Sequence, residues 1–192
     1  AAVALAIIAI PLITTLFHHG AFSANDVFRT REALVAYSVG LVGLILVKVL
    51  APGFYARQNI RTPVRIALIA LATTQTLNLL LIGPLKHAGL ALSIGLAACL
   101  NALLLYRGLR RQGIYAPQPG WLLFSAKLLL ALGVMSATLT FMSGNASDWL
   151  SFGAFERVAR LAAIVAAAGT AYFATLWLTG FRLRDFRRRG AE

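Results

Sequence analysis

The chain is built from long apolar runs separated by short polar segments. Six runs can be traced, at residues 1–17, 33–51, 64–82, 88–106, 122–142 and 158–179. A helix of about 19 residues is about 28 Å long, close to the hydrocarbon thickness of a bilayer. The runs are continuous and rich in Ala and Leu, without the alternation of a half-buried strand. The pattern predicts an all-α fold, a polytopic transmembrane helix bundle with six spans.

Composition supports this class and excludes others. Apolar residues make up 59% of the chain and charged residues only 12%, against about 25% charged in ordinary soluble domains. A soluble domain this apolar could not cover its surface with polar groups. The net charge of +12 would suggest nucleic acid in a soluble protein, but in a membrane protein it indicates basic loops on one side. The single Cys99 excludes a disulfide framework and a cysteine-based metal site.

The segment 48–64 predicts a polar hairpin between two membrane helices. Pro52 and Gly53 follow the second run, and proline lacks the N–H that a helix interior needs, so we expect the helix to stop there. Pro63 suits the first turn of the next helix, with Thr62 as its N-cap. Arginines at 57, 61 and 65 place the charge of this hairpin on one side of the bilayer.

The distribution of basic residues predicts the orientation. One side of the predicted bundle carries eleven: Arg57, Arg61, Arg65, Arg107, Arg110, Arg111, Arg182, Arg184, Arg187, Arg188 and Arg189. The other side carries four: Arg29, Arg31, Lys86 and Arg157. The richer side is expected in the cytoplasm, together with both ends of the chain. Tryptophans fall near the predicted boundaries, Trp121 and Trp177 on the cytoplasmic side and Trp149 on the other.

The turns suggest how the spans are grouped. Gly83, Pro84 and Gly89 leave a very short turn, so the third and fourth runs should form a tight antiparallel pair. The segment 18–32 is expected to lie at the outer surface as an amphipathic loop. The proline-rich segment 116–121 is a stiff connector, which divides the chain into residues 1–115 and 122–192. The chain starts inside an apolar run, at Ala1, so we expect it to be the C-terminal part of a longer protein.

Carboxylates are informative through their positions. All six lie in loops or at span ends: Asp26, Glu32, Asp148, Glu156, Asp185 and Glu192. A metal-dependent membrane enzyme would need paired carboxylates to hold its metal ion, so no catalytic residue is predicted. His18, His19 and His87 lie on the same side as Asp26, but adjacent histidines at a helix end point in different directions. We therefore expect interfacial histidines, no metal site and no cofactor.

Lys48 is the most informative cation, because it lies inside an apolar run. It has two interpretations: its ammonium reaches the cytoplasmic headgroups along a snorkelling side chain, or it faces a wet cavity. Lys127 and Arg160 lie within one turn of their span ends, and snorkelling is expected for both.

Polar and small residues recur at helical spacing in the third and fourth runs. Ala70, Thr74 and Asn78 share one face with Gln75 beside them, and they indicate either hydrogen bonding between helices or a polar, cation-coordinating face. A second stripe predicts close helix packing and consists of Gly89, Ser93, Ala97 and Asn101. In the second run Gly40 and Gly43 fit either close packing or a point of bending.

Four segments carry a resemblance to a known family. They are PLITTLFHHGAFSANDV (11–27), AYSVGLVGLILVKVLAPGFYARQNIRTPVRIA (36–67), LIGPLKHAGLALSIGLAACLN (81–101) and APQPGW (116–121). Together they closely resemble the MurJ (MviN) family of lipid II flippases, whose members have fourteen transmembrane helices of the multidrug/oligosaccharidyl-lipid/polysaccharide exporter type. This chain is similar to helices nine to fourteen, the last two being the extra helices after the connector.

The resemblance implies a transporter in the bacterial inner membrane. It would move lipid II, the undecaprenyl-linked peptidoglycan precursor, to the periplasmic leaflet by alternating access of two lobes around a cationic cavity, with its tail in a groove bordered by the last two helices. Partners would be lipid II, membrane lipids and the N-terminal half of the same protein. The family's main cavity arginines lie outside this chain. Some members bind a coupling cation on the eleventh helix.

The resemblance also suggests roles for individual residues. Lys48, Gln75 and Asn78 are candidates for the cavity or its gate, and Thr74 and Asn78 for a cation-binding face, although Asn78 stands where a carboxylate would be the stronger ligand. Candidate bending points are Gly40, Gly43, Pro52 and Gly53. No cofactor is implied, and coupling would use a monovalent cation or the membrane potential.

Three other functions remain open from the residues alone. The first is export of another polyprenyl-linked saccharide or a small molecule by the same superfamily. The second is a scaffold for cell-wall synthesis that transports nothing. The third is a membrane enzyme, which would need acidic residues outside this chain. A scaffold would tolerate Lys48→Ala and Asn78→Leu as long as the protein inserts. A flippase would lose flipping in Lys48→Ala while its abundance stayed normal.

Overall fold

The computed structural model describes residues 1–17, 22–115 and 120–180, and this part of the chain is helical without strands. The helices are α1 (Ala2–Ile7), α2 (Ala9–Phe17), α3 (Ala24–Tyr55), α4 (Arg61–Arg111), α5 (Trp121–Ser143), α6 (Ala146–Ser151) and α7 (Ala154–Leu178). By length and composition α3, α4, α5 and α7 are each apolar enough to cross a membrane. The predicted all-α membrane bundle is therefore confirmed.

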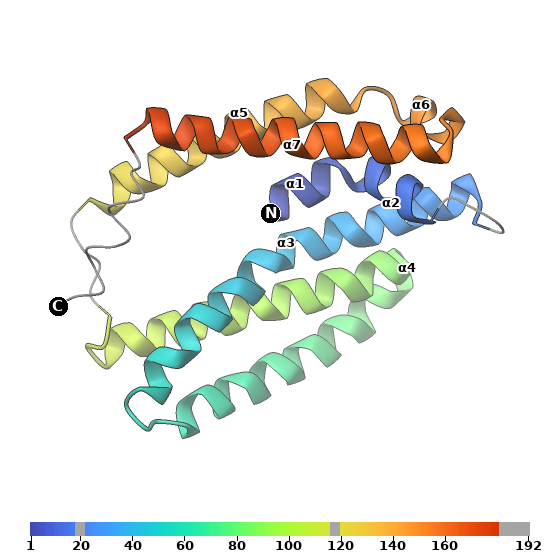
Figure 1. Cartoon of the computed structure of the whole chain (residues 1–192). Coiled ribbons are helices and arrows are strands. Elements are labelled where there is room, and N and C mark those ends of the chain that lie inside the picture. The colour runs from blue at the N-terminus through green and yellow to red at the C-terminus, as the bar shows by residue number, and fades with distance from the viewer. Residues whose placement is uncertain (18–21, 116–119, 181–192) are drawn as a thin grey trace.

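The helices form two packed groups with a short pair between them. Helix α3 packs along α4, α5 packs against α7, and α1 and α2 touch both groups. Figure 1 shows this order, with the blue α1 and α2 lying between the orange α7 and the α3–α4 group. Helices close in the sequence thus pack together, and the start of the chain lies against both groups.

Helix α4 is two antiparallel segments rather than one rod. It has 51 residues, and a straight helix of that length would be about 76 Å long, more than twice the hydrocarbon thickness. Its only non-helical backbone is at Lys86, with φ 47° and ψ −122°, and the chain reverses there (Figure 1). The first segment (61–85) and the second segment (87–111) correspond to the third and fourth predicted spans. The short turn expected around Gly83 and Pro84 is thus reduced to a single residue.

The predicted count of six spans is not confirmed. Helix α4 contains two predicted spans, but the first predicted span is divided at Ile8 into α1 and α2, and neither is long enough to cross a bilayer alone. Pro11 accounts for the break, because its ring clashes with the carbonyl four residues earlier and it has no N–H to donate. Pro11 thus predicts the division at Ile8, although the apolar pattern alone shows one continuous run.

Three boundary predictions are wrong. The segment 18–32 is not all loop, because α3 begins at Ala24 behind a capping box in which Ser23 and Asp26 bond each other's backbone N–H. Pro52 does not end its helix, which continues to Tyr55. Thr62 is not the N-cap of α4, a position held by Ile60.

Two contacts explain the corrected boundaries of the hairpin. Phe54 is fully buried in a cluster with Ile66, Leu105 and Leu109, so packing holds the last turn of α3 although Pro52 offers no N–H to the carbonyl of Lys48. The side-chain oxygen of Asn59, one residue before the N-cap Ile60, accepts a hydrogen bond from the backbone N–H of Thr62 at 3.2 Å. This bond satisfies one of the N–H groups that have no partner within the first turn of α4.

The α5–α7 pair has a core of large side chains. Its cluster contains Met135, Leu139, Trp149, Ile164 and Ala168, with Ile8 from the first helix pair. Trp149, expected at the membrane boundary, is only 1% exposed, and its indole N–H donates to the carbonyl of Ser143 at 2.6 Å. Trp121 and Trp177 are exposed, as residues at a membrane boundary would be.

Candidate functional site

The α3–α4 contact is a backbone-to-backbone approach. A Cβ on Gly40 would overlap the Cα of Gly95, and a Cβ on Gly43 would lie 2.5 Å from the backbone nitrogen of Cys99. In the second stripe Gly89, Ser93 and Ala97 are buried and Asn101 is half-buried. Small residues let membrane helices approach closely, so packing accounts for both glycine positions on α3.

Toward the end of α3 the glycines of this contact meet side chains instead of backbone. A Cβ on Gly53 would lie 3.0 Å from Cδ2 of Leu109, and one on Gly108 would lie 2.9 Å from Cζ of Phe54. Pro52 is exposed. Three of the four candidate bending points, Gly40, Gly43 and Gly53, therefore lie in the packed contact with α4. Bending of α3 at any of them requires the second segment of α4 to move as well.

Lys48 is exposed and lies away from this contact. The α3 residues that pack toward the cluster around Phe54 are Val47, Leu50 and Ala51, so Lys48 is on a neighbouring face. At helical spacing it shares that face with Leu44, Pro52 and Tyr55. Lys48 is therefore exposed beside the contact with α4 and not in it, which is compatible with both of its interpretations.

The polar face of the first segment of α4 contains one unusual atom. The hydroxyl of Thr74 donates a hydrogen bond to the carbonyl of Ala70 at 2.9 Å. A hydroxyl in an apolar helix is commonly satisfied in this way, by the carbonyl four residues earlier. Gln75 is exposed. Asn78 is half-buried, and its side-chain oxygen is buried without a hydrogen-bond partner among the described residues. An unpartnered buried acceptor costs about 1–3 kcal/mol, so Asn78 is the residue of this face that packing does not explain.

An apolar cavity of about 750 Å³ lies between α3 and the second segment of α4, and Trp121 at the start of α5 also lines it. From α3 its lining includes Val42, Leu46 and Val49, and from α4 it includes Leu103. Tyr106, Tyr115 and Trp121 also line it. The cavity is large enough for a section of hydrocarbon chain.

Arg157 is a buried cation that the charge pattern placed in a loop. It lies in the first turn of α7 and is only 9% exposed. Its guanidinium donates to the carbonyl of Thr14 at 3.3 Å and to the carbonyl of Leu150 at 2.9 Å. These carbonyls belong to α2 and α6, so one side chain ties the first helix pair to the last two helices. Thr14 is 143 residues away, and no local spacing could reveal this contact.

The two other span-end cations each lie close to another segment of the chain. The guanidinium of Arg160 lies 4.7 Å from the ring centre of Phe152, a cation–π distance. The Nζ of Lys127 lies 3.9 Å from a Cβ built on Gly180, just beyond the end of α7, where a helix favours positive charge. No group of three metal-ligating side chains occurs within the described ranges. His18, His19, residues 116–119 of the connector and the basic tail from Arg182 lie outside those ranges.

These features define a polytopic helical membrane protein with a close-packed, glycine-lined helix group and polar residues within its spans. A family model described as lipid II flippase MurJ matches residues 1–160, so the chain belongs to that family.

Relatives agree with the family match over nearly the whole chain. The lipid II flippase MurJ of Burkholderia cenocepacia is 47% identical over 190 residues, which are 98% of this chain and 37% of the relative. Proteins named probable lipid II flippase MurJ from Vibrio cholerae and Haemophilus influenzae are 38% and 39% identical, each over 95% of this chain. They are covered over 35% and 36% of their own lengths. The chain thus spans little more than a third of these relatives.

Proposed function

We propose that this chain is part of a lipid II flippase, a transporter that moves the undecaprenyl-linked peptidoglycan precursor from the cytoplasmic to the periplasmic leaflet of the bacterial inner membrane. The observation that carries the proposal is the family match over residues 1–160. The helical architecture supports it, because alternating access needs helix groups that move as units. The remainder of the cavity, with its main arginines, would come from chain outside these 192 residues.

The charge distribution supports an orientation with the 56–60 hairpin in the cytoplasm. Phe54, Ile66 and Leu109 share one cluster, so the hairpin and the end of α4 lie at the same end of the bundle. Six exposed arginines gather there: Arg57, Arg61, Arg65, Arg107, Arg110 and Arg111. Such a concentration is typical of a cytoplasmic face.

Within the proposed transporter, Lys48 supplies a cation to the substrate cavity or its cytoplasmic gate. A diphosphate leaving water needs charge-assisted partners, and Lys48 is exposed on a face of α3 that does not pack against α4. The apolar cavity beside Trp121 offers hydrocarbon surface for part of the polyprenyl tail. No covalent bond changes in this process, and the chain needs no catalytic residue or cofactor.

Asn78 and Thr74 form the candidate site for a coupling monovalent cation. The buried side-chain oxygen of Asn78 has unused acceptor capacity, and the Thr74 hydroxyl oxygen lies one turn away on the same face. Oxygen atoms of this kind are the ligands that hard cations prefer. Additional ligands would have to come from outside these residues, or the membrane potential would drive the transport.

Expression of the full-length protein in bacteria depleted of their own flippase tests the proposal. We expect growth to be rescued and lipid II to become reachable from the periplasm. If the protein inserts at normal abundance while lipid II stays inside, the flippase proposal is wrong, and transport of another lipid-linked saccharide becomes the better hypothesis.

A further inference from the structure

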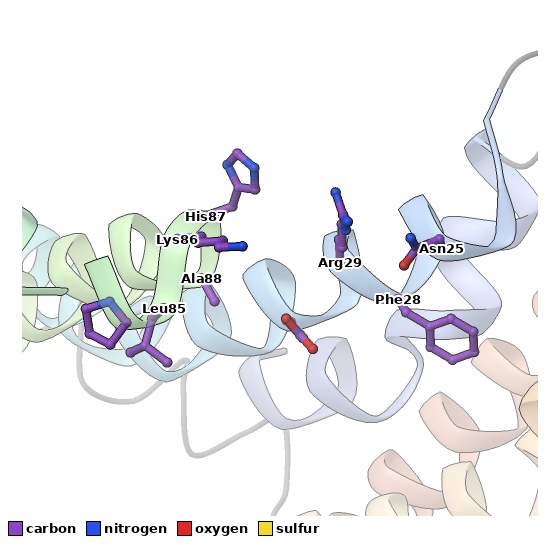
Figure 2. A pocket seen from close by; sticks show the side chains of 9 residues that line it. Asn25, Phe28, Arg29, Leu85, Lys86, His87 and Ala88 are labelled. Carbon is purple, nitrogen blue, oxygen red and sulfur yellow. The ribbon is translucent and has the colours of Figure 1, made fainter. Parts of the chain in front are cut away.

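A polar pocket of about 390 Å³ lies at the end of the bundle opposite the arginine-rich hairpin. It is formed where α3 begins and where α4 reverses direction. Its charged lining residues are Arg29 and Glu32 from α3 and Lys86 from α4, with His87 beside them. Figure 2 shows Lys86 extending toward α3, with His87 and Arg29 on the same side of the pocket. Two cations and one carboxylate therefore share a site of ligand size.

The backbone conformation at Lys86 is unfavourable for any residue with a side chain, which suggests that the lysine side chain is functional. At φ 47° and ψ −122° a residue with a side chain is strained, by about 1–3 kcal/mol, whereas glycine adopts positive φ freely. The turn itself would therefore be better made by glycine. A lysine at this position places its ammonium in the pocket at the expense of local stability. The second segment of α4 starts beside it, and the positive end of its dipole favours an anion there.

An apolar groove continues from this pocket along the helices. A second hollow of about 450 Å³ shares Glu32, Leu85 and Ala88 with the polar pocket and adds Val35, Val39 and Leu92. Arg31 lies on its lining as well. The polar pocket falls just outside the predicted spans, at headgroup depth, while Val35, Val39 and Leu92 fall inside them. The combined site is therefore polar at the membrane surface and apolar within the bilayer.

We propose that this site binds a phospholipid whose headgroup carries both a phosphate and a primary ammonium. Arg29 and Lys86 would hold the phosphate, because basic pockets between membrane helices bind lipid phosphates. Glu32, at the junction of the two hollows, would accept hydrogen bonds from the ammonium. An acyl chain would follow the groove past Val35 and Val39. The proposal does not depend on lipid II being the transported substrate.

Native mass spectrometry of the full-length protein tests this proposal. The protein would be exposed to an equimolar mixture of phosphatidylethanolamine, phosphatidylcholine and phosphatidylglycerol. We expect phosphatidylethanolamine to be retained at least about fivefold more than the other two, a difference of about 1 kcal/mol. Arg29→Gln should remove this retention. Glu32→Gln should leave lipid bound but remove the preference over both other lipids, because only Glu32 distinguishes a primary ammonium from the methylated ammonium of phosphatidylcholine and from the uncharged glycerol of phosphatidylglycerol. Arg65→Gln, at the opposite end of the bundle, is the matched control and should leave retention unchanged.

Lys86→Gly separates binding from folding. Glycine suits the backbone of this position, so the variant should unfold at a higher temperature than the parent while losing phosphatidylethanolamine. Three results would overturn the proposal: retention that is equal for all three lipids, retention led by phosphatidylglycerol and insensitive to Glu32→Gln, or displacement of the lipid signal by inorganic phosphate alone. No lipid retained at all would mean that protein from outside this chain fills the site, which also overturns it.

Discussion

The α3–α4 group and the α5–α7 pair solve the same packing problem in different ways. In the first, Gly40 meets Gly95 so closely that neither position has room for a Cβ. In the second, the contact is made by large side chains such as Leu139 and Ile164. A Cβ added at Gly133 or Gly169 would meet no atom of the described residues. Lipid tails are as apolar as leucine, so membrane helices gain from packing rather than from the hydrophobic effect. Backbone contact gives more packing but tolerates no added atom.

Gly40→Ala should show the largest effect. The added Cβ would meet the backbone of Gly95, which cannot rotate away as a flexible side chain could, so we expect a loss of about 3 kcal/mol in the free energy of unfolding. Gly133→Ala is the matched control on α5. Its Cβ meets nothing among the described residues, and it should gain about 0.5–1 kcal/mol from helix propensity. Thermal unfolding of the two full-length variants measures both; shifts of the same sign would contradict the comparison.

Arg157→Met should be next in size. It would leave the carbonyls of Thr14 and Leu150 without their charged donor, at a cost of about 2–3 kcal/mol. Arg157→Lys should lose less, because an ammonium can still donate to one of them. Limited proteolysis should cleave the Met variant sooner than the parent, in the chain segments between α2 and α7. Cleavage and unfolding indistinguishable from the parent would show that this contact does not hold α2 against α6 and α7.

Asn78→Leu should raise the stability of the protein and lower its transport activity. Removing a buried acceptor without a partner should raise the free energy of unfolding by about 1 kcal/mol, while periplasmic lipid II should fall if the amide serves a cation or the cavity. Thr73→Val is a matched control, because Thr73 bonds only the carbonyl of Ile69 and is half-buried on a neighbouring face. A stable variant with full transport would remove Asn78 from the proposed site.

The smallest stability effects should come from the helix starts. Helix α3 has a capping box at Ser23, so Ser23→Ala should cost about 1 kcal/mol. Helix α7 starts after Gly153 without a side-chain cap, so Gly153→Ser should gain a few tenths of a kcal/mol. Thermal unfolding of both variants checks the pair, and a stabilising Ser23→Ala would show that the capping box does not hold the end of α3.

Apolar length and spacing were enough to predict the helical class and the packing stripe from Gly89 to Ala97. They did not predict helix boundaries or burial correctly where a few tertiary contacts outweigh the local sequence preference. Packing of Phe54 carries α3 past Pro52, and the ring of Pro11 divides a run that hydropathy alone reads as continuous. Arg157 resembled a loop cation because its partners lie far away in sequence, and Trp149 resembled an interfacial residue because its burial depends on α7. Asn78 was found from spacing, but its unpartnered oxygen needed the structure.

The most direct test compares one lysine from each helix group for its effect on transport. Lys48 on α3 is exposed beside the contact with α4, whereas Lys127 on α5 lies by the end of α7. The measurement is the amount of lipid II reachable from the periplasm in depleted cells that express full-length Lys48→Ala or Lys127→Ala at equal abundance. We predict a clear loss for Lys48→Ala and none for Lys127→Ala. Equal transport by both variants would contradict the account and leave Lys48 as a snorkelling residue.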